Sequence, residues 1–310
     1  MRINQEINKI NYALINSWCK ETSYELVKDN WSLKNKSLGQ CAITSLIIQD
    51  YLGGDIVFAE TIFDNSSVIN HYWNFIDNID YDLTIQQFTS NYKFINKKIV
   101  SRNTLLGNLD TLKRYQILKE KVDNYLLELN NIELLIQKCK LCDLEKINGY
   151  NIYFGSNTKI LMIGEAPAKN GWRITGKAWI NEQNKVIPSG KILEKLLINT
   201  SVSLFDISFI ELIKCFPTDR KNLKNYASNC LYIFDKQIEL LKPELIITLG
   251  EIPTKALLKE LNFKKLSDVT GKEFKYRNST IIPIFHPSPI SPKSYNDNKP
   301  IFDNVISKYF

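Results

Sequence analysis

The sequence predicts an α/β protein of two domains, with a four-stranded parallel sheet flanked by helices in the second half and an α+β domain in the first. Three observations lead to this prediction. The chain has 310 residues, which is more than one domain usually needs. In the second half, short apolar runs alternate with segments of helical periodicity. Hydrophobic residues make up 44% of the chain, which is ample for packed cores.

The first half ends in a helical segment. Residues 104–128 carry apolar side chains at helical spacing and have no glycine or proline after Gly107. We expect one or two helices here and a boundary near 128–132. The predicted domains are therefore residues 1–130 and 131–310.

The sequence of the second half predicts strands that alternate with helices. The apolar runs expected to form buried strands are 159–164, 207–215, 244–250 and 280–285. The segments with helical periodicity are 189–199, 225–242 and 252–261. Parallel sheets of this kind bind ligands beyond the carboxyl ends of their strands. The stretches "GEAPA" (164–168), "ELIKC" (211–215) and "HPSP" (286–289) all fall there.

Charge and hydropathy narrow the function classes. Residues 1–128 have a net charge of −1 and residues 129–310 a net charge of +8, so the basic half favours a polyanionic partner such as nucleic acid. We expect no membrane association, because no apolar run approaches the roughly 20 residues of a membrane span. The N-terminus lacks a signal-peptide core, which predicts a cytoplasmic protein with reduced cysteines.

Four cysteines have the spacing of metal ligands. Cys139 and Cys142 form a C-x2-C pair, and Cys215 and Cys230 follow as C-x14-C. Two such pairs supply four thiolates for zinc or for an iron–sulfur cluster, and their spacing does not distinguish the two. The alternative is that Cys215 and Cys230 are ordinary buried thiols.

Several motifs in register resemble the iron–sulfur uracil-DNA glycosylases, family 4 in particular. The likeness covers about residues 135–295 and includes "CKLC" (139–142), "YFG" (153–155), "GEAPAKNGWRITGKAW" (164–179), "SGKILEKLL" (189–197), "IKCFP" (213–217), Cys230, "ELIITLG" (244–250) and "HPSP". The resemblance implies a structural [4Fe–4S] cluster, rather than zinc, on Cys139, Cys142, Cys215 and Cys230. It also implies DNA as the partner.

The resemblance gives His286, one of two histidines in the chain, a catalytic role. It resembles the family histidine that donates a hydrogen bond to O2 of the departing base, and Ser288 is expected to contact a phosphate. The alternative is a histidine that only caps a strand.

Glu165 is the second catalytic candidate. Family 1 enzymes have an aspartate one position later, where this chain has Ala166. Glu165 is therefore expected to position water or to stabilise the sugar cation, or else only to fix the loop. Backbone N–H groups around Ala166 are expected to bind the base.

Trp179 occupies the place of the stacking phenylalanine of the family. It is expected to lie under a flipped base, with a core tryptophan as the alternative. Arg173 and Lys177 nearby are expected to contact phosphates.

Two positions depart from the uracil-reading pattern. The family places an asparagine four residues before the strand-ending cysteine, and here that residue is Glu211. A carboxyl suits cytosine, whose N4 amine is a donor. Ala168 stands where family 1 enzymes use a tyrosine to exclude groups on C5, so it leaves room there. Both departures favour a 5-modified cytosine.

The first half contains a second constellation. Gln40 and Cys41 open a helical stretch, and His71 and Asp82 follow. Cysteine, histidine and aspartate in this order are typical of papain-like and transglutaminase-like sites, in which Gln40 would supply an oxyanion donor. Residues 15–126 are also similar to the YunG-like family, which supplies no defined activity. A pocket that binds without catalysing is the alternative.

Together these features predict a DNA glycosylase that flips and excises a base from bacteriophage or damaged DNA, with a role in antiviral defence. One alternative is a uracil-DNA repair glycosylase. Another is a catalytically silent DNA-binding module. A third places the principal activity in a cysteine hydrolase at the N-terminus, with the second half as a DNA-targeting domain.

Overall fold

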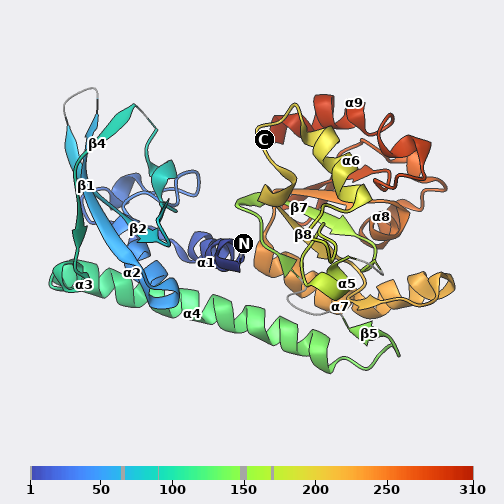
Figure 1. Ribbon diagram of the computed structural model, residues 1–310, viewed down its shortest axis with the longest axis horizontal. Coiled ribbons are helices and arrows are strands. Elements are labelled where there is room, and N and C mark those ends of the chain that lie inside the picture. Colours follow the sequence, from blue (N-terminus) through green and yellow to red (C-terminus); the bar gives the residue numbers. More distant parts are fainter. Residues whose placement is uncertain (1, 64–66, 90, 147–151, 169–170, 310) are drawn as a thin grey trace. The chain divides into compact units, whose positions relative to one another are not determined.

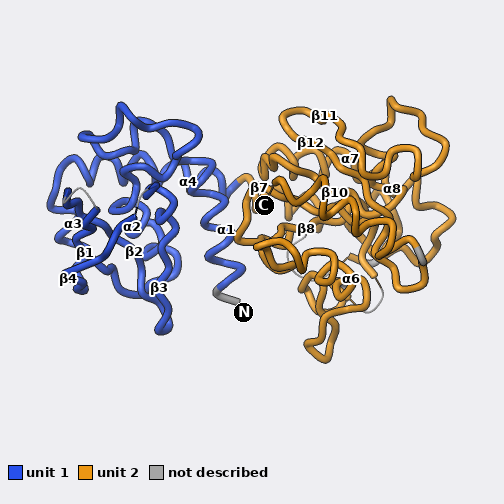
Figure 2. The backbone as a smooth tube through the Cα atoms, turned by 90° about the horizontal axis from the view of Figure 1, so that it is seen from above, with its two compact units in different colours: residues 1–127 blue, residues 128–310 orange. Residues whose placement is uncertain are grey.

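The structure, a computed structural model, divides into two compact units, residues 1–127 and residues 128–310 (Figure 2). It describes the chain except for residues 1, 64–66, 90, 147–151, 169–170 and 310. Each unit has its own sheet and its own core, so each is described by itself.

The first unit is an antiparallel sheet with helices before and after it. Helices α1 (Arg2–Ser17) and α2 (Cys41–Leu52) precede the strands. The strands are β1 (Asp55–Phe63), β2 (Val68–Ile76), β3 (Ile79–Tyr81) and β4 (Tyr92–Val100), in the spatial order β3-β2-β1-β4. Asp77 and Asn78 join β2 to β3 with positive φ angles of 48° and 64°, the conformation of a two-residue hairpin turn. The arrangement is α+β, and its likeness to papain or transglutaminase stays a prediction.

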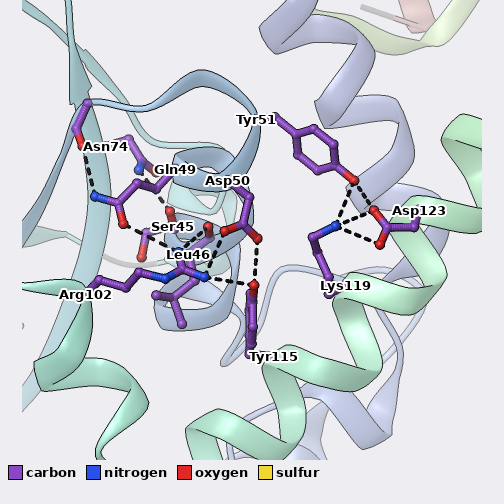
Figure 3. Close-up of polar contacts among 11 residues, drawn as sticks. Ser45, Leu46, Gln49, Asp50, Tyr51, Asn74, Arg102, Tyr115, Lys119 and Asp123 are labelled. Atoms are coloured by element: carbon purple, nitrogen blue, oxygen red, sulfur yellow. Dashed lines mark hydrogen bonds and ion pairs between the residues drawn. The ribbon is translucent and has the colours of Figure 1, made fainter.

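The helices of the first unit pack against the sheet and against one another. Leu46 of α2, Ile56 of β1 and Leu105 form one buried cluster. A polar network joins α2 to the helices that follow β4 (Figure 3). Asp50 of α2 forms an ion pair with Arg102 (2.8 Å) and accepts a hydrogen bond from Tyr115 (2.7 Å). These contacts fix the position of α2, which begins at Cys41 as the sequence predicts.

Two helices follow β4. The first is the short α3 (Arg102–Leu106), and the second is α4 (Leu109–Lys138), which has 30 residues. Helix α4 therefore runs without a break across the boundary at 127 and reaches the first cysteine pair of the second unit.

The second unit contains a mixed, six-stranded sheet in the order β11-β12-β10-β7-β8-β6. Its centre is four parallel strands, namely β7 (Asn157–Gly164), β8 (Ile207–Glu211), β10 (Leu245–Leu249) and β12 (Ser279–Ile284). The expectation of a four-stranded parallel sheet was incomplete. Two short antiparallel strands, β6 (Ile152–Tyr153) and β11 (Phe274–Tyr276), form the edges. They are too short for an apolar period to reveal them.

The strand predicted over 207–215 is shorter than expected. Strand β8 ends at Glu211, and Cys215–Phe216 form a separate strand, β9, which pairs with β5 (Glu145–Lys146). Leu212 and Ile213 instead donate their backbone N–H groups to the carbonyls of Gly164 and Glu165, at 3.0 Å each. The chain therefore leaves the sheet to hold the loop that follows β7.

Helices cover both faces of this sheet (Figure 1). The described α-helices after α4 are α5 (Trp172–Thr175), α6 (Pro188–Leu197), α7 (Leu223–Leu241), α8 (Glu251–Leu257) and α9 (Lys299–Ile301). Leu193 of α6 and Phe302 share one buried cluster with Met162 of β7 and Ile247 of β10. Among the described residues, no helix is both long and apolar enough to span a membrane.

Candidate active site

The four parallel strands end at one edge of the sheet and carry the candidate site there. Gly164 and Glu211 are register partners at the ends of β7 and β8. Gly250 follows β10, and His286 lies two residues beyond the end of β12. The prediction that the three motif stretches lie at the carboxyl ends of the strands is confirmed.

Glu211 lies across the backbone of Gly164. A side-chain Cβ at position 164 would overlap the Glu211 carboxyl and lie 2.8 Å from the Phe209 ring, so only glycine fits there. Glu211 Oε2 is shielded from solvent and has no hydrogen-bond partner among the described residues. A buried carboxyl oxygen without a partner costs free energy, so an ordered water or a ligand that pairs with it would stabilise the site.

Burial raises the pKa of the Glu211 carboxyl to about 8. The positive charge of Lys214 opposes this shift, and the negative charge of Glu165 adds to it. Glu211 is therefore held protonated at neutral pH and has both a proton to donate and an oxygen to accept.

His286 is held in place from two sides. The fully buried Asn298 accepts from the backbone N–H of Phe285 (2.9 Å) and donates to its carbonyl (2.8 Å), which fixes the end of β12. Gly250 has a φ of 97°, and a Cβ there would lie 3.2 Å from the Cβ of His286. His286 as a whole residue is exposed, although its imidazole is partly desolvated by its surroundings.

Glu165 forms an ion pair with Arg220, a residue that the sequence analysis missed. Arg220 begins a 3₁₀ turn (Arg220–Asn222) in the loop after β9. Its place just beyond the "IKCFP" motif was the one signal available in the sequence. Desolvation lowers the pKa of His286, the charge of Glu165 opposes this change, and Arg220 adds to it. The His286 imidazole is thus neutral at pH 7.

The aromatic residues lie deeper than the stacking hypothesis requires. Trp179 has a φ of 64°, is 5% exposed, and packs against Phe209 with ring centroids 4.3 Å apart. Its indole N–H is buried without a partner among the described residues. Phe209 was missed, although it lies two residues before Glu211 and therefore on the same face of β8. Ala166 is partly exposed and Ala168 is exposed on the loop after β7.

The three predicted phosphate contacts come from two regions, helix α5 with the residues just after it, and the loop after β12. Lys177 is exposed after α5, and Arg173 lies within α5 with a side chain outside the described part of the structure. Ser288 donates its backbone N–H to the His286 carbonyl (2.7 Å), which turns the chain sharply after the histidine. Lys177 and Ser288 therefore remain expectations as DNA contacts.

The four predicted ligand cysteines line one pocket. Cys139 and Cys142 follow α4, Cys215 lies in β9, and Cys230 lies in α7. Apolar side chains such as Ile136 and Ile233 complete the wall. The side-chain amide of Asn229 donates to Cys142 Sγ (3.3 Å), and the backbone N–H of Lys214 interacts with Cys230.

The electrostatics of this pocket suit a cationic centre. Burial and the neighbouring thiolate charges raise the pKa of Cys215 to about 11, and burial likewise raises that of Cys230. A bound metal centre reverses this effect, because it stabilises thiolates. Among the described residues, no group of three or more His, Cys, Asp or Glu side chains is placed to hold a metal ion. Four thiols are nevertheless the donor set of both structural zinc sites and iron–sulfur clusters.

The predicted cysteine, histidine and aspartate of the first unit also lie close together. Cys41 is the first residue of α2, and its thiol interacts with the buried ring of His71 on β2. His71 Nε2 lies 2.6 Å from Asp82 Oδ2. Gln40 is fully buried, and its amide donates to the carbonyl of Cys19 (3.1 Å), so its predicted role as an oxyanion donor has a competing partner.

Comparison with known proteins divides the chain in the same way. Residues 152–308 match the family described as the uracil DNA glycosylase superfamily. The type-4 uracil-DNA glycosylase of Saccharolobus solfataricus is 28% identical over 172 residues, which cover 52% of this chain and 77% of that protein. The type-5 uracil-DNA glycosylase of Pyrobaculum aerophilum is 22% identical over 143 residues, or 44% of this chain and 63% of that protein.

The first unit matches a different family. Residues 6–127 match the family described as YunG protein. YunG of Bacillus subtilis is 37% identical over 79 residues, which cover 26% of this chain and 60% of that protein.

Proposed function

Since this chain belongs to the uracil DNA glycosylase superfamily and is a DNA glycosylase, we propose that it excises a 5-modified cytosine from DNA and leaves an abasic site. The observation that carries the choice of base is the carboxyl of Glu211, buried over Gly164 with an unpartnered Oε2. The target nucleotide must leave the base stack to reach it.

His286 supplies the electrostatic part of the reaction. The bond between the base and C1′ of the sugar breaks with negative charge developing on the base and positive charge on the sugar. A neutral imidazole N–H aimed at O2 of the base stabilises that negative charge. The lowered pKa of His286 keeps its imidazole in the neutral form without an excess positive charge.

Glu165 acts on the sugar side of the bond. Its carboxylate, oriented by the ion pair with Arg220, stabilises the sugar cation and directs water to C1′. The water oxygen bonds to C1′ and the departing base takes up a proton. Backbone N–H groups at Ala166 bind the base, and Trp179 supports the Phe209 ring beneath it.

Glu211 matches cytosine better than uracil. A protonated carboxyl donates to N3 of cytosine, and its second oxygen accepts from the N4 amine. Uracil presents N3–H as a donor and O4 as an acceptor, so it would meet a second donor if the carboxyl proton is held on the oxygen that faces N3. The proposed preference for cytosine requires the proton to be on that oxygen. The raised pKa of Glu211 supports the protonated form.

Ala168 favours a modified base. It is exposed and small, which leaves room for a substituent on C5. An enzyme that removed ordinary cytosine would damage the DNA of its own host, whereas bacteriophage DNA with hydroxymethylated or glycosylated cytosine offers a distinct target. A role in defence against bacteriophages follows from this choice of base.

The test is a base-release assay on matched DNA duplexes and single strands that differ in one base. We expect release from DNA with 5-hydroxymethylcytosine or its glucosylated form, and little from cytosine. Abasic sites are scored by strand cleavage in alkali. Robust uracil release with none from any 5-modified cytosine would overturn the proposed base and point to uracil repair.

We also propose that Cys139, Cys142, Cys215 and Cys230 hold a [4Fe–4S] cluster in a reducing, cytoplasmic setting. The cluster would tie the loop after α4 to β9 and α7, and so stabilise the strand that follows Glu211. Four inward-facing thiols in an apolar pocket support this assignment.

Protein purified without oxygen should be brown, with broad absorbance near ~400 nm from iron bound to thiolates. Cys230→Ser should remove most of this absorbance and lower the melting temperature, because one ligand and its buried contacts are lost. Cys19→Ser, in the first unit, is the matched control and should leave both unchanged. Colourless protein with stoichiometric zinc would refute iron and retain the four-cysteine site.

A further inference from the structure

The first unit contains a nucleophile at the start of a helix. Cys41 is partly exposed and is the first residue of the 12-residue helix α2. Gly39, two residues before Cys41, is tightly held, because its carbonyl accepts hydrogen bonds from Tyr24 N–H (3.0 Å) and from Arg114 Nη1 (3.3 Å). A Cβ on Gly39 would come within 2.7 Å of Ser23 and Val27. The thiol is therefore presented by a rigid turn at the start of the helix.

His71 provides the base beside this thiol. The residue is fully buried on β2, and its ring stacks on Phe94 with centroids 5.5 Å apart and 6° between the planes. Asp82 Oδ2 lies 2.6 Å from Nε2, and the Cys41 thiol also interacts with the ring. The amide of Gln87 lies 3.2 Å from Nδ1 and also accepts from Gly39 N–H (3.3 Å). Gln87 thus links the base to the turn that carries the nucleophile.

Asp82 is itself fixed in orientation. Its second carboxylate oxygen accepts hydrogen bonds from the backbone N–H and the hydroxyl of Thr84, both at 3.0 Å. Cys41, His71 and Asp82 therefore supply a nucleophile, a base and a carboxylate that orients the base, and each of the three is held in place by different neighbours.

Charge supports the same assignment. Burial lowers the pKa of His71, but the hydrogen bonds and charges of Asp82 and Cys41 outweigh it and raise the pKa to about 9. At neutral pH the ring is thus positively charged and can stabilise a thiolate on Cys41. Titratable and charged groups nearby include Tyr72, whose pKa is raised by burial and by the Cys41 charge, and Arg114, which donates to the Gly39 carbonyl.

We infer that the first unit is a cysteine hydrolase acting on acyl substrates, with Cys41 as nucleophile, His71 as general acid and base, and Asp82 as a positioning residue. Cys41 Sγ bonds to a carbonyl carbon of an amide or ester. The bond to the leaving nitrogen or oxygen breaks, and the leaving group takes the proton from His71. Water then adds to the thioester, His71 accepts its proton, and the acid and the thiolate are released.

The start of α2 can serve the developing oxyanion of an acyl substrate, because its first backbone N–H groups have no partner within the helix. Tyr72 is the aromatic neighbour of Cys41, and Tyr24, which is 44% exposed, interacts with Tyr72 and lies under the Arg114 guanidinium.

The first test is the rate of alkylation by iodoacetamide in the full-length protein kept without oxygen, followed by peptide mass mapping. Cys41 should react at pH 6 on the order of tenfold faster than Cys19, the other partly exposed cysteine of this unit, because the neighbouring His71 can take up its proton. Asp82→Asn should slow Cys41 and leave Cys19 unchanged. Asp82 is 16% exposed and His71 is fully buried, so the melting temperature of Asp82→Asn serves as the check on folding.

The second test uses 4-nitrophenyl acetate as an activated acyl probe. We expect a burst of one nitrophenol per chain, an acetyl group on Cys41, and steady turnover afterwards. Cys41→Ser should lose the burst, and Asp82→Asn should lower turnover and shift its pH profile, whereas Cys19→Ser should change neither. The inference fails if Cys41 alkylates no faster than Cys19, or if the acetyl-enzyme forms and is not hydrolysed.

Discussion

Replacing His286 with alanine should slow base release on the order of 10²–10³-fold while DNA affinity changes little. The expected loss of barrier lowering is about 2.7–4 kcal/mol, which is the effect of removing one preorganised hydrogen-bond donor from a developing anion. DNA affinity depends mainly on phosphate contacts, for which Lys177 and Ser288 are the expected residues. Single-turnover release rates and binding to an uncleavable DNA analogue separate the two quantities.

The matched control is Ser291→Ala, on the same loop beyond the histidine. It should retain both base release and binding. A histidine that only closed the end of β12 would behave differently. In that case His286→Ala would weaken binding and turnover together and lower the melting temperature, and the electrostatic role would be wrong.

Replacing Glu211 with asparagine should reverse the choice of base. An asparagine amide accepts from uracil N3–H and donates to O4, whereas the protonated carboxyl serves N3 and N4 of cytosine. Sites that read a base through buried hydrogen bonds reject a mismatched partner by roughly 10⁴–10⁵. We expect the ratio of uracil release to modified-cytosine release to rise on the order of 10⁴-fold.

Glu165→Gln is the control for this change. It should lower release of every base together and leave the ratio unchanged, since Glu165 acts on the sugar. The pH profile supplies an independent check. Because the pKa of Glu211 lies at about 8, modified-cytosine release should fall as pH rises through 8, when the carboxyl loses its proton. Glu211→Asn should abolish this fall, and an unchanged ratio with an unchanged profile would mean that Glu211 does not read the base.

The sequence predicted the parallel core of the second unit because its strands are continuous apolar runs. The described segments of β7, β8, β10 and β12 lie where these runs predict them. The edge strands β6 and β11 were missed, since two or three residues carry no usable period. Strand β8 ended early because the backbone beyond Glu211 bonds to the loop after β7, a partner distant in sequence.

The same distinction applies to the candidate site. Positions that depend on the local sequence could be predicted, and contacts between distant parts of the chain could not. Glu165, Glu211 and His286 follow predicted strands, so their positions at one edge of the sheet could be foreseen. Arg220 could not, because its ion pair joins loops 55 residues apart in the chain. The competing partner of Gln40 also depends on a residue far away, the carbonyl of Cys19.

The sheet edges described above bear on association between copies of the chain. An exposed strand edge is a template for adding another strand, and short or lysine-rich edge strands weaken that template. The second unit ends its sheet with β6 and β11, of two and three residues, and the first unit exposes Lys93, Lys97 and Lys98 along β4. The neighbours of β6 and β11 in the sheet are β8 and β12, whose side chains are almost wholly buried. Loss of either edge strand would thus uncover an apolar strand able to pair with a second molecule, so these few residues guard against aggregation.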